Sequence, residues 1–162
     1  MNSSFGTDEY IKKIVLTHSK RLLSASYAIL KSVPSAEDAV QEAFIKLITK
    51  QPSFNDDEHE KAWLLRVTVN ISLNMLKKSK VNDCLIESDV IYADNSDFVL
   101  LESVLSLPVQ YRTVIHLYYY EGYSIKEIAS ILRIPSATVG TRLSRGRKLL
   151  KIKLEEEGDL WL

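Results

Sequence analysis

Six basic side chains crowd one short stretch of this sequence, from Ser136 to Leu154, and no acidic residue interrupts them. They are Arg142, Arg145, Arg147, Lys148, Lys151 and Lys153. Guanidinium and ammonium groups at this density bind phosphates through charge-assisted hydrogen bonds. The stretch therefore predicts contact with a polyanion.

Charge is segregated along the chain, although 21 Lys and Arg residues balance 21 Asp and Glu residues. Residues 81–103 contain acids and no basic residue, residues 104–154 are strongly basic, and residues 155–162 are acidic again. Association follows local potential more than net charge, so this pattern favours a polyanionic partner. The alternative is that the charges only solvate exposed helix faces.

Helical periodicity runs through the first half of the chain. We predict helices from Asp8 to about Lys31, over residues 36–50, and from about Lys61 to Lys78. Ser35, just after Pro34, is the expected N-cap of the second helix. In the third helix one apolar stripe is expected to face the core, and it comprises Trp63, Val67, Ile71 and Met75.

The second half of the chain contains a helix-turn-helix pattern. Pro108 and Gly122 bound one predicted helix, with Leu117, Tyr118 and Tyr119 expected in the core. Ser124 and Glu127 form a capping box for a short second helix. A turn at Ile134 and Pro135 then leads into the basic stretch.

The basic stretch sorts into two faces when it is drawn as a helix. One face carries Thr138, Thr141, Arg145 and Lys148, with Arg142 on its flank. The opposite face carries Val139, Leu143, Gly146 and Leu150. Such a helix can enter the major groove, where its first turns read base edges and its later basic residues bind phosphates. The alternative is an amphipathic helix that binds a protein.

These patterns predict an all-α protein of two small helical domains joined by a flexible acidic linker, with the helix-turn-helix in the second. The predicted boundaries are 1–78 for the first domain, 79–97 for the linker, 98–154 for the second domain and 155–162 for an acidic tail. No apolar run approaches 18 residues and no secretory signal is expected.

Catalytic and metal-binding constellations are not expected in this sequence. Cys84 is the single cysteine, and His18, His59 and His116 are scattered without metal-ligand spacing. No glycine-rich phosphate loop and no nucleophile–base set is present. We therefore expect no cofactor and no metal, a protein that is not an enzyme, and a cytoplasmic location.

Five segments, in order and spacing, carry a resemblance to a known family. They are "AEDAVQEAFIKL", the phenylalanine at Phe54, "WLLRVTVNISLN", "LPVQYRTVIHLYYYEGYSIKEIASIL" and "TVGTRLSRGRKLL". Over residues 10–78 and 98–152 the chain resembles bacterial sigma factors of the sigma-70 class, extracytoplasmic-function (ECF) type. The resemblance implies that the first domain is region 2 and the second is region 4.

The resemblance also implies which residues bind core RNA polymerase and promoter DNA. The exposed face of the second helix meets the β′ clamp helices through Asp38, Gln41, Glu42 and Ile45, and part of the second domain meets the β flap. The −10 element is bound by Phe54, Asn55, Asn70, Lys77 and Lys78. The −35 element is read by Thr138, Thr141, Arg142, Arg145 and Lys148.

An anti-sigma factor is a further partner that the resemblance implies. Two other functions compete with the interpretation as a sigma factor. One is a two-domain helix-turn-helix transcriptional regulator that binds duplex DNA without polymerase. The other is a decoy or adaptor that binds polymerase and no promoter.

Overall fold

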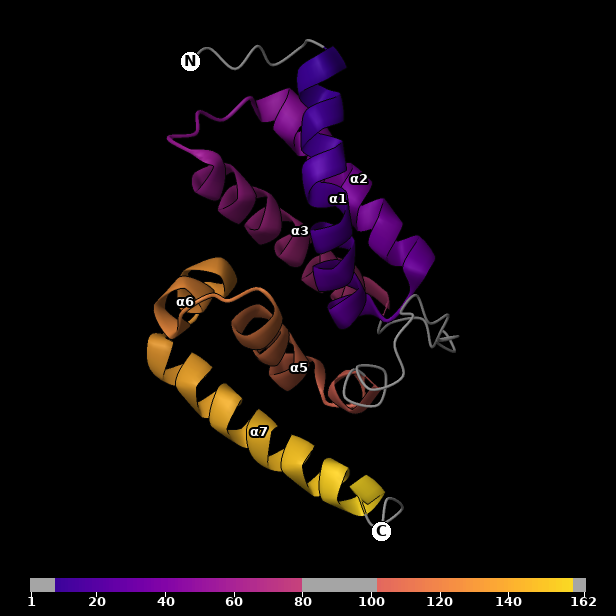
Figure 1. The fold of residues 1–162 in the computed structure, drawn as a ribbon, viewed down its shortest axis with the longest axis vertical. Helices are drawn as coiled ribbons and strands as arrows, with labels where there is room; N and C mark the ends of the chain where they lie inside the picture. The colour runs from indigo at the N-terminus through magenta and orange to yellow at the C-terminus, as the bar shows by residue number, and fades with distance from the viewer. Residues whose placement is uncertain (1–7, 80–101, 159–162) are drawn as a thin grey trace. The chain divides into compact units, whose positions relative to one another are not determined.

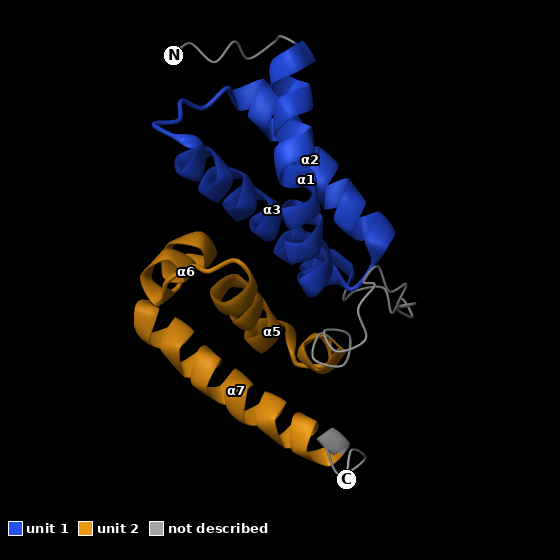
Figure 2. Cartoon of the chain, in the orientation of Figure 1, with its two compact units in different colours: residues 1–88 blue, residues 89–162 orange. Residues whose placement is uncertain are grey.

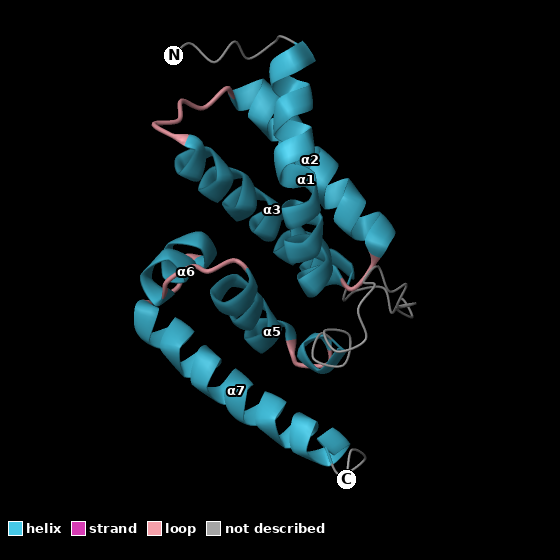
Figure 3. Ribbon diagram, in the orientation of Figure 1, coloured by secondary structure: helices cyan, strands magenta, loops and turns pink. Residues whose placement is uncertain are grey.

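The computed structural model describes residues 8–79 and 102–158, and the chain divides into two compact units, residues 1–88 and 89–162 (Figure 2). All secondary structure in the described ranges is helical (Figure 3). The prediction of two small helical domains is therefore confirmed. The predicted linker beyond Ser79 and the end of the predicted tail, residues 159–162, lie outside the described residues.

Unit 1 is a bundle of three helices, α1 (Asp8–Leu30), α2 (Val33–Lys50) and α3 (Asp57–Ser79), and each helix packs on the other two (Figure 1). Small side chains lie at the contacts of α2, where Ala39 and Ala43 are fully buried. Inside the bundle the hydroxyls of Ser26 and Ser72 are 2.7 Å apart, which joins α1 to α3 without an unsatisfied polar group.

Helix α2 begins earlier than the sequence predicted. Its N-cap is Ser32, whose hydroxyl accepts a hydrogen bond from the amide of Ser35 at 3.4 Å. Pro34 lies in the first turn, where its missing N–H costs nothing because that group has no partner within the helix. The prediction of Ser35 as the cap was therefore wrong.

Helix α3 also differs from the prediction. It begins at Asp57, because Asp56 accepts the amide of His59 at 2.7 Å and so caps the first turn. Of the predicted stripe, Ile71 is buried, and Trp63, Val67 and Met75 are half-buried. The residues that α3 buries are Leu64, Leu65, Thr68, Val69, Ile71 and Ser72.

Unit 2 is built from α5 (Val109–Ile115), the π-helix η1 (His116–Tyr120), α6 (Ile125–Leu132) and α7 (Ser136–Gly158). The predicted capping box of α6 is present, with Ser124 and Glu127 each accepting the other's amide. Arg133 then adopts a left-handed conformation with φ 56° and turns the chain toward α7. This arrangement confirms the helix-turn-helix.

Two contacts position α5 in unit 2. Helix α7 packs on it at Gly146, where an added Cβ would lie 2.8 Å from Cδ1 of Ile115 and 3.3 Å from Cβ of Tyr111. Within α5, the buried Arg112 donates a hydrogen bond from its guanidinium to the carbonyl of Leu107, just before the helix, at 2.9 Å. Burial lowers the pKa of Arg112 to about 10, so it stays cationic at neutral pH.

Substitution of the two glycines of α7 tests this packing, because an alanine meets nothing at Gly140 and meets two side chains at Gly146. We expect Gly140→Ala to raise the free energy of unfolding by about 0.5–1 kcal/mol through helix propensity. We expect Gly146→Ala to lower it by about 1 kcal/mol, because Ile115 is buried and has little room to move. Urea unfolding followed by circular dichroism measures both, and equal stabilisation by the two variants would contradict the close packing.

Candidate functional site

The predicted DNA-reading face of α7 is exposed to solvent over most of its length. Thr141, Arg145 and Lys148 are exposed, whereas Thr138 and Arg142 are half-buried. The other side of the helix is anchored in the core by Val139 and Leu143, which have no exposed surface, and by Gly146. The structure therefore brings the five predicted −35 residues together on one helix face. Their role stays a prediction.

A hollow of about 390 Å³ opens beside this face. Its lining consists of Gln110 and Tyr111 from α5 and of Ala137, Thr138, Thr141, Arg142 and Arg145 from α7. The sequence pointed to the four reading-face residues here, but it carried no signal for Gln110 and Tyr111. Those two lie 26 and 25 positions before the first residue of α7, Ser136, and only packing places them beside it.

Arg147 is set apart from the reading face. Its guanidinium carbon lies 5.9 Å from the ring centroids of both Tyr118 and Tyr119, a cation–π geometry. Leu117 is buried as predicted, but Tyr119 is 55% exposed, so its placement in the core was wrong. The wider turn of the π-helix shifts the register of these tyrosines, which α-helical periodicity does not anticipate.

The predicted polymerase-binding residues form a single patch on α2. Asp38, Gln41, Glu42 and Ile45 are all exposed, and Ile45 keeps 60% of its surface in contact with solvent. They recur at spacings of three and four, so they share one side of the helix. Two acids with an exposed apolar residue among them suit a basic partner surface with an apolar contact in it.

The loop before α3 is held by its own side chains. Phe54 is half-buried and contacts His59 and Trp63 edge-on, with ring centroids 5.4 Å and 5.9 Å apart. The backbone N–H of Asn55 donates to Nδ1 of His59 at 3.1 Å, and the side chain of Asn55 is exposed to solvent. The loop is therefore tied to the first turn of α3.

The predicted −10 residues are spread along α3 rather than gathered. Asn70 is half-buried near the middle of the helix, and Lys77 and Lys78 are exposed in its last turn. At 1.5 Å per residue, Asn70 lies about 20 Å and Lys77 about 30 Å along the axis from the start of α3. A row of this length suits an extended strand of nucleic acid better than one compact ligand.

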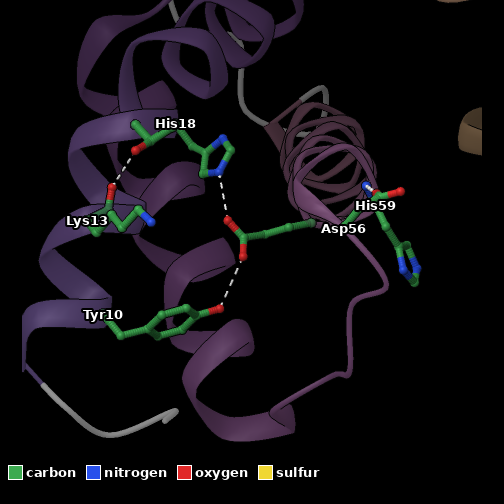
Figure 4. Close-up of polar contacts among 7 residues, drawn as sticks. Tyr10, Lys13, His18, Asp56 and His59 are labelled. Carbon is green, nitrogen blue, oxygen red and sulfur yellow. Dashed lines mark hydrogen bonds and ion pairs between the residues drawn. The ribbon is translucent and has the colours of Figure 1, made fainter. Parts of the chain in front are cut away.

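A partly buried polar contact holds the start of α3 against α1 (Figure 4). One carboxylate oxygen of Glu60 lies 3.0 Å from Nε2 of His18, and the other accepts the hydroxyl of Tyr10 at 3.2 Å. Burial, together with the neighbouring carboxylate of Glu60, raises the pKa of Tyr10 to about 12. Nothing local in the sequence marks Tyr10 or Glu60, because their pairing joins positions 50 apart.

Neither a metal site nor a membrane span is found where the structure describes the chain. Residues 8–79 and 102–158 hold no group of three His, Cys, Asp or Glu side chains placed to bind a metal ion. Within the same ranges, every helix is too short or too polar to cross a membrane.

Known proteins resemble this chain over nearly its whole length. Residues 14–81 match the family model of sigma-70 region 2, and residues 98–150 match that of sigma-70 region 4. The ECF RNA polymerase sigma factor SigW of Bacillus subtilis (strain 168) is 30% identical over 172 residues, covering 93% of this chain and 92% of SigW. The ECF RNA polymerase sigma-E factor of Escherichia coli (strain K12) is 29% identical over 150 residues, covering 78% of each chain.

Two solved structures share the fold. The sigma factor RpoE of Bartonella quintana, solved with the anti-sigma factor NepR, aligns with a TM-score of 0.71 at 24% identity, covering 89% of this chain and 96% of RpoE. CnrH, solved with the cytosolic domain of CnrY, aligns with a TM-score of 0.66 at 21% identity, covering 93% and 91%.

The contact between Tyr10 and Glu60 predicts a pH dependence of stability. An unfolded tyrosine ionises near pH 10, whereas folded Tyr10 keeps its proton until about pH 12. Its contribution is therefore complete below pH 10 and is lost as the pH rises from 10 to 12. We expect the free energy of unfolding to fall more steeply over this range in the wild type than in Tyr10→Phe, as measured by urea unfolding at each pH. Identical slopes would show that Tyr10 titrates normally.

Proposed function

Because this chain belongs to the ECF family of RNA polymerase sigma factors, we propose that it binds core RNA polymerase and directs the enzyme to specific promoters. The observation that carries this proposal is that the chain has two surfaces of opposite charge, one on each unit. The acidic patch on α2 lies inside the region 2 match, and the basic face of α7 lies inside the region 4 match. One suits a basic protein surface and the other suits DNA.

The α2 patch is the proposed contact with the polymerase. Asp38 and Glu42 face the basic β′ clamp helices. Gln41, which lies between these two acids, hydrogen-bonds to the clamp helices, and Ile45 supplies the apolar part of the interface. The patch is exposed along two helical turns, so binding needs no rearrangement of unit 1. A second contact, of unit 2 with the β flap, completes the holoenzyme.

Promoter recognition is divided between the two units. Thr138, Thr141, Arg142, Arg145 and Lys148 bind the −35 duplex in its major groove. Phe54, Asn55, Asn70, Lys77 and Lys78 bind the −10 element as it melts. Extruding a base costs a few kcal/mol in lost stacking, and contacts of the base with this loop offset that cost. Because Phe54, His59 and Trp63 already hold the loop in place, no further free energy is lost in ordering it.

Catalysis in this proposal belongs to the polymerase, and the protein itself lends recognition and melting. The place of action is the cytoplasm, where the polymerase works. Control by an anti-sigma factor is part of the proposal. RpoE was solved with the anti-sigma factor NepR, and CnrH was solved with the cytosolic domain of CnrY.

Run-off transcription tests the polymerase contact. The full chain is mixed with bacterial core polymerase and with the DNA upstream of its own gene. We expect a discrete transcript, and we expect it to fall about tenfold or more when Asp38, Gln41 and Glu42 are replaced by alanine, because interface charges carry binding energy.

The matched control removes two exposed acids elsewhere in unit 1, Asp8 and Glu9 of α1, and should leave the transcript unchanged. Co-purification with core gives the binding directly. A protein that binds duplex DNA alone and never core polymerase would instead be a helix-turn-helix regulator.

Separate DNA probes test the division between the two units. Holoenzyme carrying Asn55→Ala should bind a single-stranded −10 oligonucleotide about tenfold more weakly, through the loss of hydrogen bonds to a base. It should bind a −35 duplex fragment normally. Arg145→Ala should show the reverse pattern. The assignment fails if Asn55→Ala leaves single-strand binding intact or if both variants weaken both probes equally.

A further inference from the structure

The hollow between α5 and α7 belongs wholly to unit 2. It adjoins the reading face of α7, and four of its seven lining residues are predicted −35 residues. The other wall comes from α5, which packs on α7 (Figure 1). A reading helix that enters a groove therefore carries this hollow with it to the edge of the DNA.

Close packing gives the hollow its shape. Because residue 146 has no side chain, α5 lies near enough to α7 for Cβ of Tyr111 to sit 3.3 Å from the place that a Cβ of residue 146 would occupy. Tyr111 is half-buried at this place, and Gln110, the residue before it in α5, is exposed. The wall is thus formed before any ligand binds, which reduces the entropy lost on binding.

The lining chemistry selects an anion. Among the described residues that line it, Arg142 and Arg145 are the charged ones, and none carries a carboxylate. The amide of Gln110 and the hydroxyls of Tyr111 and Thr138 are neutral hydrogen-bonding groups, whereas the hydroxyl of Thr141 already donates to the carbonyl of Ala137 at 3.0 Å. Guanidinium forks combined with neutral donors suit phosphate oxygens.

We infer that this hollow seats a backbone phosphate of the −35 duplex, with Gln110 and Tyr111 as DNA contacts from α5. The inference rests on the proposed function and extends it to two residues outside the helix-turn-helix. Arg142, half-buried on the side of α7 nearest this wall, binds the same phosphate rather than a base edge. The exposed Thr141, Arg145 and Lys148 remain to face the groove.

Gln110→Glu tests the seat with little change of shape, because it places a negative charge against the phosphate. In the reconstituted holoenzyme we expect affinity for a −35 duplex to fall by more than tenfold, since like charges in contact cost several kcal/mol. Tyr111→Phe keeps the ring packing and removes the hydroxyl, and it should cost about fivefold to tenfold. Equal urea midpoints and equal binding to core polymerase show that each variant is folded.

The control for the added charge is Ser130→Glu. Ser130 is exposed on α6, outside both the lining of the hollow and the reading face of α7, and its substitution should leave binding within about twofold because salt screens distant charges. An equal loss for Ser130→Glu and Gln110→Glu would overturn the inference.

Sequence preference and salt dependence separate a phosphate seat from base reading. Selection from a library with a randomised −35 element should return the same preferred sequence for Gln110→Glu and Tyr111→Phe as for the wild type. Arg142→Ala should reduce the slope of log affinity against log salt by about 1, without changing the preferred sequence. A changed preference in any of these variants would overturn the inference.

The failure of this inference is distinguishable from failure of the proposed function. If Gln110→Glu binds the −35 duplex normally while Arg145→Ala does not, the seat is refuted and the sigma function stands. If the wild-type holoenzyme binds no promoter duplex at all, the proposed function fails and the seat fails with it.

Discussion

Helices in both units approach one another closely where one of them carries alanine or glycine. In unit 1, Ala39 and Ala43 of α2 lie at zero exposure against the other two helices. In unit 2, Gly146 leaves no room for even a methyl group beside Ile115. Small residues on the packed side allow dense contact between backbones, so the core is held by one side of each helix. On α2 and α7 the long polar side chains lie on the opposite side, and those sides carry the proposed functional surfaces.

The loop before α3 depends on a second set of contacts, which are polar. Glu60 joins the first turn of α3 to Tyr10 and His18 of α1, while Asp56 and His59 tie the loop to that turn. A partly buried carboxylate requires hydrogen-bond partners, so Glu60 constrains α1 and α3 together. The consequence is a loop whose backbone is held in place by contacts within unit 1 alone.

Local surfaces of opposite charge, one on each unit, let one neutral chain serve two partners. The acidic patch on α2 favours a basic protein surface, and the basic face of α7 favours DNA. Within α7 the first acid, Glu155, follows the whole reading face and lies 3.9 Å from Lys151, with both side chains exposed. Such an exposed pair contributes little to stability. The charge on the reading face of α7 is therefore available for binding rather than used in the fold.

Periodicity and local capping were enough to predict the two helical domains, the helix-turn-helix, the Ser124–Glu127 box and the faces of α2 and α7. These features depend on residues within a few positions of one another, whose spacing the sequence states directly. The cap at Ser32 was mispredicted because Pro34 is tolerated in the first turn of a helix. The exposure of Tyr119 was mispredicted because a π-helix changes the helical period.

Tertiary structure alone decided which distant residues meet. It set Glu60 against Tyr10 and His18, and it set Gln110 and Tyr111 beside the reading face of α7. Nothing local in the sequence encodes such pairs, since they arise where separate helices pack and depend on how closely Gly146 lets α5 approach. The sequence by itself determined the helices and the charge on their outer faces, and the packing of those helices decided the hollow and the ordered loop.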